Sequence, residues 1–309
     1  GIIAFILAER AAGHEAILPL ALFKSSAFTG STIMGVIVGV GMFGGMMTIP
    51  LLLQIVMGAT PTESGFMMLP MVFGMMTGTT LSGQITAKTG KYKIFLSTGT
   101  GFLTLGYVYM LGFTYDSAYP WMAVGMVLIG FGLGQLMQTL TLVAQQSVPA
   151  SEVGVATSSA TFFRQMGGTL GVAIFISILF NGLGDKISKA FENKDVLKDI
   201  AAATQDKKVL ADKNNLELIK AMNDAKTSGA ASGAGSALGD KLSTDSSFLS
   251  HVDHRLARPF LMGFADSAVP VFMWASIIIA IAFAMSFFIK ANPLRDKSAS
   301  QEAAEAAMH

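Results

Sequence analysis

Cysteine is absent from this chain of 309 residues, and charged residues make up only 13% of it. The absence of cysteine excludes disulfide bonds and thiolate metal sites. The scarcity of charge excludes a globular protein in water, because soluble domains carry about 25% charged residues and 52% of this chain is hydrophobic. A net charge of +1 gives no basis for a nucleic-acid partner, and we expect none.

Catalytic side chains are equally scarce. The histidines lie in expected loops or in the tail, and they show neither the spacing of metal ligands nor a pairing with a nucleophile. We therefore expect no enzymatic activity, no cofactor and no metal site. Asp and Glu are also missing from the long apolar segments, so we expect no proton-carrying carboxylate within them.

Six long apolar segments dominate the chain, and short polar turns separate the first five. Each segment is near or above the ~20 residues with which a helix crosses a bilayer. Their approximate bounds are 29–57, 65–86, 94–113, 121–142, 155–180 and 268–289. These segments predict an all-α polytopic membrane protein, because only helices or closed barrels can span lipid.

The expected division of the chain follows from these segments. Residues 1–8 are apolar but too short to cross a bilayer, so we expect them to end an earlier helix and the sequence to be a fragment. The expected parts are 1–28, the end of a preceding transmembrane helix and a cytoplasmic linker; 29–180, five transmembrane helices; 181–266, an extracytoplasmic polar segment; 267–290, the last transmembrane helix; and 291–309, a cytoplasmic tail.

The orientation is predicted by the loops. Lys and Arg mark the cytoplasmic side when they are counted over short loops. Eight of them lie on one side, namely Arg10, Lys24, Lys88, Lys91, Lys93, Lys290, Arg295 and Lys297, and the short turns near 58–64 and 114–118 hold none. The C-terminus is therefore expected in the cytoplasm and the segment 181–266 outside.

The external segment carries 12 basic and 12 acidic residues, and a segment this long crosses largely regardless of its charge. Apolar residues at helical spacing predict one or two amphipathic helices in its first part. Residues 227–239 are rich in Gly, Ala and Ser, which is typical of a flexible linker. The sequence favours a solvated cap over an element that docks a partner or gates substrate, and both remain open.

Several side chains inside the segments are candidates for a substrate cavity. Met71 and Met75 are four residues apart, and methionine adapts to ligands of different shapes, although ordinary packing is an alternative. Gln135 and Gln138 share a helix face, where their amides either line a water-filled cavity or tie helices together. Pro70, in the second segment, is expected to kink its helix.

Arg164 is the only charged residue within an expected span. A small and polar face of the same helix suggests that it points into the bundle, and ionisable residues inside a membrane are functional candidates by default. The alternative is that the side chain reaches the cytoplasmic headgroups. The two interpretations carry equal weight.

The turn after the second segment resembles the loop signature of the major facilitator superfamily. That signature consists of Gly, two or three residues, an acid, a basic residue, then Gly and further basic residues. The matching positions are Gly83, Lys88, Gly90, Lys91 and Lys93, and Ala87 replaces the usual acid. The resemblance implies that the turn is a conformational-gating loop, and the departure at Ala87 removes the acid on which a charge latch would depend.

A more specific resemblance lies in the stretches 130–145, 148–154 and 161–171. They resemble the fourth and fifth helices of the C-terminal bundle in the fourteen-helix drug:proton antiporter branch of the same superfamily. The resemblance covers nearly all of residues 1–180 and 268–290. It implies that the segments form the C-terminal six-helix bundle, that the first, second, fourth and fifth line the central cavity, and that the N-terminal half is missing from this sequence.

The function implied by the resemblance is secondary-active multidrug export, by drug:proton antiport with alternating access. The implied partners are lipophilic or cationic small molecules, protons, the lipid bilayer and the missing N-terminal half, and the implied location is the cell (plasma) membrane. One alternative is export of a metabolite, peptide or lipid by the same fold. Another is a non-transporting membrane protein that displays its external segment to a partner.

Overall fold

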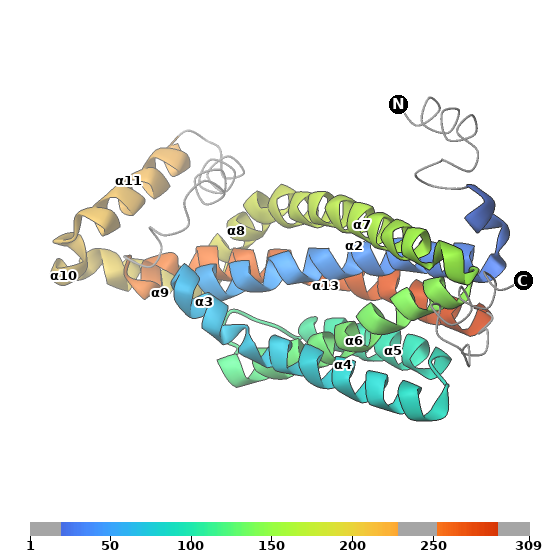
Figure 1. Ribbon diagram of the computed structural model, residues 1–309. Helices are drawn as coiled ribbons and strands as arrows, with labels where there is room; N and C mark the ends of the chain where they lie inside the picture. The colour runs from blue at the N-terminus through green and yellow to red at the C-terminus, as the bar shows by residue number, and fades with distance from the viewer. Residues whose placement is uncertain (1–19, 228–251, 290–309) are drawn as a thin grey trace, which may run out of the picture.

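The computed structural model describes residues 20–227 and 252–289, and the structural statements below concern these residues. Within them every regular element is a helix and no strand occurs (Figure 1). The expected tail of an earlier span at 1–8, nearly all of the linker at 227–239 and the cytoplasmic tail at 291–309 lie outside the described residues.

Six long helices form a bundle. They are α2 (Ser26–Ile55), α4 (Leu69–Thr89), α5 (Lys93–Met110), α6 (Tyr119–Gln146), α7 (Val153–Asn181) and α13 (His254–Phe288). The shorter elements are η2 (Leu20–Lys24), α3 (Pro61–Met67), η3 (Ala150–Glu152), α8 (Leu183–Phe191), α9 (Lys194–Gln205), α10 (Lys207–Leu210) and α11 (Lys213–Thr227). In Figure 1 the long helices run lengthwise beside one another, and α9, α10 and α11 lie at one end.

Four helical stretches of the described chain are long and apolar enough to cross a membrane, namely α2, α6, the run Val153–Phe191 and α13. The described part of the chain is thus all-helical and contains several helices that could span a membrane, as the sequence predicts. The helices α4 and α5 have 21 and 18 residues, and a larger share of their side chains are hydroxyls and amides than in the other four long helices. The prediction of six membrane spans is confirmed in part.

The second apolar segment, expected to be one helix from 65 to 86, is divided into α3 and α4. At the start of α3 the side chain of Thr60 accepts a hydrogen bond from the amide of Glu63, and the Glu63 carboxylate accepts one from the amide of Thr60 at 2.9 Å. The new helix α4 begins at Leu69 with Pro70 in its first turn. Proline lacks an amide hydrogen, so a helix start is the place where it costs least.

The last helix is longer than expected. The sequence predicts its start at 267, but α13 begins at His254, where the side chain of Asp253 accepts a hydrogen bond from the amide of Arg255 at 3.0 Å. Residues 254–266 of the expected external segment therefore continue the last helix. A boundary chosen from hydropathy could not find this start, because the first turns of α13 contain two arginines.

Two close helix pairs, α2 with α7 and α4 with α6, make up much of the bundle. A Cβ atom on Gly39 of α2 would clash with the carbonyl oxygen of Arg164 on α7, and one on Gly130 of α6 would clash with that of Met71 on α4. Only glycine lets the backbones approach this closely. In lipid, where helices gain little from hydrophobic burial against each other, such close packing is a main source of association.

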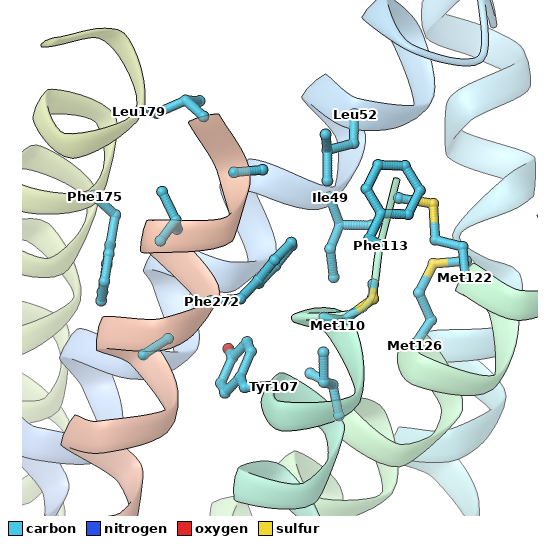
Figure 2. Packing of buried hydrophobic residues seen from close by; sticks show 14 of the residues in the cluster. Ile49, Leu52, Tyr107, Met110, Phe113, Met122, Met126, Phe175, Leu179 and Phe272 are labelled. Carbon is cyan, nitrogen blue, oxygen red and sulfur yellow. The ribbon is translucent and has the colours of Figure 1, made fainter. Parts of the chain in front are cut away.

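The middle of the bundle is filled by apolar side chains from α2, α5, α6 and α13 (Figure 2). Phe272 of α13 stacks near Tyr107 of α5, with ring centroids 6.4 Å apart. The hydroxyl of Tyr107 is fully buried and donates a hydrogen bond to the carbonyl oxygen of Gly41 on α2 at 2.8 Å. The core therefore joins the two close helix pairs through α5 and α13, and its buried hydroxyl has a partner.

Charged side chains fasten α9 and the start of α10 to the bundle. Arg258 of α13 contacts the carboxylate of Asp199 on α9, and its guanidinium also donates to the hydroxyl of Tyr115, in the turn between α5 and α6, at 2.7 Å. Arg255 pairs with Asp206, at the start of α10, at 3.1 Å. The helices α8 and α9 therefore lie against the first turns of α13 and form part of the same body.

Candidate substrate-binding region

The candidate methionines lie on α4, where that helix packs against α6. Met71 is 1% exposed, and its main chain faces Gly130. Met75 is partly buried on the same side. The open side of α4 carries Phe73 and Met76, which are 62% and 61% exposed. In this conformation Phe73 and Met76 form the adaptable surface of α4, and Met71 offers no surface to a ligand.

The glutamines of α6 have different environments. Gln135 is buried, and its side-chain oxygen accepts a hydrogen bond from the hydroxyl of Thr98 on α5 at 2.6 Å. Gln145 donates from Nε2 to the hydroxyl of Thr157 on α7 at 3.1 Å. Gln138 is exposed. Gln135 and Gln145 thus join α6 to its neighbours, and Gln138 is open to a ligand in this conformation.

Arg164 lies partly buried on α7, beside α2. Its Cβ atom is 3.9 Å from the position that a Cβ on Gly35 would occupy. It follows the start of α7 by 11 residues, which places its Cα roughly 16 Å along the helix. Within residues 20–227 and 252–289, no carboxylate lies within ion-pair distance of its guanidinium. The cation is therefore available to a partner from elsewhere.

The basic turn connects α4 to α5 in very few residues. Gly83 lies within α4 and Lys88 in its last turn, and Gly90 ends the helix with a φ of 69°, a conformation that glycine adopts without strain. Lys91 is exposed. Lys93 begins α5, and its Nζ donates a hydrogen bond to the carbonyl oxygen of Phe287, near the end of α13, at 3.1 Å. The turn therefore contacts the end of α13 as well as joining α4 to α5.

The helices α4 and α7 lie at opposite edges of the bundle in Figure 1, and both carry exposed apolar side chains. On α7 the exposed large apolar side chains are Phe162, Met166, Leu170 and Ile174. Aromatic and methionine side chains can adapt to apolar surfaces of varied shape. Among the described residues no group of His, Asp and Glu could hold a metal ion. The arrangement suits binding of apolar molecules or of another helix bundle.

The charged contacts between the start of α13 and the helices α9 and α10 were not expected from the sequence. The carboxyl of Asp206 has a pKa below its usual value, chiefly because the side chain of Arg255 donates a hydrogen bond to it. The two arginines just before the last apolar segment were a signal of such contacts, because charged side chains so near a membrane span need partners. Their partners could not be identified from the sequence, because Asp199 and Tyr115 are 59 and 143 residues from Arg258.

Comparison with known proteins identifies the family of this chain. The model of the Major Facilitator Superfamily matches residues 6–172, which is more than half of the chain. The chain belongs to the Major Facilitator Superfamily. The resemblance in the basic turn and in the helices after it is thereby confirmed, and membership indicates a multi-pass membrane transporter rather than an enzyme.

Among its relatives in the superfamily are proteins of drug resistance and export. The chain is 29% identical to the tetracycline resistance determinant of Streptomyces rimosus, over 98% of this chain and 82% of that protein. It is 35% identical to the multidrug transporter protein MdtP of Bacillus subtilis, over 58% of this chain and 33% of that protein. It is 30% identical to the tetracenomycin C resistance and export protein of Streptomyces glaucescens, over 55% of this chain and 32% of that protein.

Proposed function

We propose that this superfamily chain is part of a secondary-active multidrug exporter that exchanges lipophilic, often cationic compounds for protons by alternating access. The chain would supply the C-terminal half of the substrate cavity and act in the plasma membrane with its C-terminus in the cytoplasm. The relatives that are named for tetracycline resistance, multidrug transport and tetracenomycin C export support this function.

The observation that carries the proposal is the environment of Arg164. A guanidinium in an apolar helix is costly to keep, and such residues mark substrate or ion pathways. The side chain is partly buried, and its Cβ atom lies 3.9 Å from the position that a Cβ on Gly35 of α2 would occupy. That placement against α2 supports the reading in which the charge faces the bundle over the reading in which it reaches the headgroups.

The substrate surface in this proposal combines side chains of α4, α6 and α7. Met71, Met75, Gln135, Gln138 and Arg164 remain the candidates, and the structure adds Phe73 and Met76, whose side chains are the most exposed of the large apolar ones on α4. Burial of Met71 and Gln135 in this conformation requires that they become accessible in another state of the cycle. The apolar surfaces of α4 and α7 would pack against a second bundle of the same protein.

Proton coupling in this proposal depends on side chains of that second bundle. The six long helices described here contain one carboxylate, Asp266 of α13. It is exposed and lies 22 residues from Phe288, about 33 Å along the helix, which places it at the far boundary of a ~30 Å hydrocarbon core. Because this carboxylate is exposed and is not embedded in the bundle, we assign proton carriage to acidic residues of the N-terminal half.

The proposal is tested by substitution of Arg164 in the complete transporter. Arg164→Ala should abolish energised efflux of a lipophilic cationic dye while the amount of protein in the membrane stays unchanged. Arg164→Lys should restore efflux only in part, because lysine keeps the charge but lacks the planar fork of donors. Lys24→Ala, which removes an exposed cation elsewhere, is the matched control and should pump normally. Unchanged efflux in Arg164→Ala would refute the role of this charge.

A further inference from the structure

A groove of about 340 Å³ runs between α5 and α13, away from the candidate substrate region. On α5 it is lined by Ser97, Thr98, Gly101, Phe102 and Leu105, and on α13 by Phe283 and Phe287. It begins one turn from the basic turn, because Ser97 follows Lys93 by four residues. From Lys93 to Leu105 the helix rises by roughly 18 Å, which is close to half of a ~30 Å hydrocarbon core. The groove therefore has the depth of one leaflet.

The absence of a side chain on Gly101 creates the groove. A Cβ atom at this position would lie 3.5 Å from the ring of Phe283, so any longer side chain would enter the space beside that ring. At the end nearer the basic turn, the hydroxyls of Ser97 and Ser286 are 2.8 Å apart and hold α5 against α13. The groove is thus part of the contact between α5 and α13, and the hydrogen bond between Ser97 and Ser286 fixes its width at one end.

The hydroxyls that line the groove have no free donor proton to offer an occupant. Ser97 is paired with Ser286, and Thr98 donates its hydroxyl to Gln135. The rings of Phe283 and Phe287 form the α13 wall, with centroids 5.1 Å apart. An occupant must therefore be apolar along the length of the groove.

A cation lies at the open end of this apolar groove. Lys93 donates one hydrogen bond from Nζ to the carbonyl oxygen of Phe287, which is itself a groove residue. An ammonium group has three donors, so two remain for an acceptor outside the protein. Lys88 and Lys91 in the same turn are exposed and add positive charge. The combination of an apolar groove of leaflet depth with a cation at the headgroup level matches one class of molecule.

We propose that the groove between α5 and α13 is a binding site for an anionic phospholipid. One acyl chain lies along Gly101, Phe102 and Leu105, and the phosphate accepts hydrogen bonds from the ammonium of Lys93. Attraction of a lysine to an anionic lipid surface corresponds to about a fivefold preference over a lipid without net charge. The bound lipid would fasten the basic turn to α13, because Lys93 would contact the phosphate and also contacts Phe287 of α13.

The test uses the complete transporter in nanodiscs, in a background without other cysteines. A Leu105→Cys variant carries a bimane label at the rim of the groove, and Ile281→Cys, on another face of α13 at similar depth, is the control position. Phosphatidylglycerol or phosphatidylcholine with brominated acyl chains is added at the same low mole fraction, and quenching of the bimane is measured. We expect quenching at position 105 to favour phosphatidylglycerol about fivefold, with no such preference at position 281.

Further substitutions separate the two parts of the site. Lys93→Ala should abolish the preference at position 105, Lys93→Arg should keep it, and Lys24→Ala, an exposed cation outside the turn, should leave it unchanged. Gly101→Leu should reduce quenching by both lipids to the level of position 281, because the side chain fills the groove. Size-exclusion profiles equal to that of the parent show that the variants are folded.

Two results would overturn the proposal. The first is equal quenching by both lipids at position 105, or a preference that survives Lys93→Ala, since either would show that the groove contacts bulk lipid only. The second is an absence of quenching together with a disulfide between two copies of the Leu105→Cys variant, which would identify the groove as a contact between copies of the chain.

Discussion

Gly130 on α6 allows a direct test of the packing between α4 and α6. In Gly130→Ala the new methyl group would clash with the carbonyl oxygen of Met71 and lie 3.1 Å from its Cα atom. Both are main-chain atoms, which cannot rotate away as a side chain could. The two helices would have to part by roughly 1 Å, and a gap of that size forfeits up to about half of the dispersion attraction across the contact.

The net effect follows from two opposing terms. Overpacking a close contact costs about 1–3 kcal/mol, and the rigid main chain places Gly130→Ala toward the upper end. Replacement of glycine by alanine within a helix contributes about 1 kcal/mol in the other direction. We therefore expect Gly130→Ala to lower the stability of the bundle by about 1–2 kcal/mol.

The matched controls are Gly65→Ala on α3 and Gly154→Ala on α7, where a Cβ atom meets nothing within 4 Å. These should be neutral or raise stability by up to about 1 kcal/mol, because alanine restricts the unfolded chain. The measurement is the temperature at which half of the purified, detergent-solubilised protein stops eluting as a single species, compared at one heating rate. If Gly130→Ala is as stable as Gly65→Ala and Gly154→Ala, the close contact between α4 and α6 does not exist and the argument fails.

Two further predictions concern the ends of the molecule. In intact cells, an impermeant thiol reagent should label a Lys198→Cys variant on α9 but not a Thr89→Cys variant at the end of α4, and the reverse pattern would invert the proposed orientation. At neutral pH the ionised Asp206 carboxylate holds the start of α10 to Arg255; because its pKa is lowered in the folded protein, this contribution is present above the unfolded pKa of ~3.9 and disappears as pH falls through the folded value. The protection of the amides in α9 and α10, which is the exchange rate corrected for the intrinsic rate at each pH, should therefore decrease on acidification to that range. Asp206→Asn should show the lower protection already at pH 7, whereas equal protection in both proteins at both pH values would contradict the role of this contact.

Much of the bundle could be predicted from the sequence because lipid imposes a simple rule on its helices. An apolar run near 20 residues predicts a span, and this rule found α2, α6, α7 and the membrane part of α13. It failed at the division between α3 and α4 because Pro70 lies in the first turn of a second helix that begins within the apolar run. It failed at the start of α13 because hydropathy measures preference for lipid, and a helix can continue into water.

The candidate site was less accessible to sequence reasoning. Periodicity places Gln135 and Gln138 on one side of α6, but it does not identify the neighbouring helix that each amide meets. Gln135 has Thr98 as its partner, whereas Gln138 remains exposed. The spacing of Met71 and Met75 likewise places both residues on one face of α4. It could not show that this face lies against α6.

The close packing of the helix pairs bears on how this chain would move during transport. The main chain of Arg164 lies against Gly39, and that of Met71 lies against Gly130, so neither contact has space in which one helix could slide past the other. We therefore expect α2 and α7 to move as one unit, and α4 and α6 as another. The guanidinium of Arg164 would then be carried by a rigid pair, so that the distance between this charge and a second bundle changes through rotation of whole helices. The surroundings of a charge fixed in this way can differ between the two states although its own helix does not change. Alternating access requires this of a residue at the substrate path.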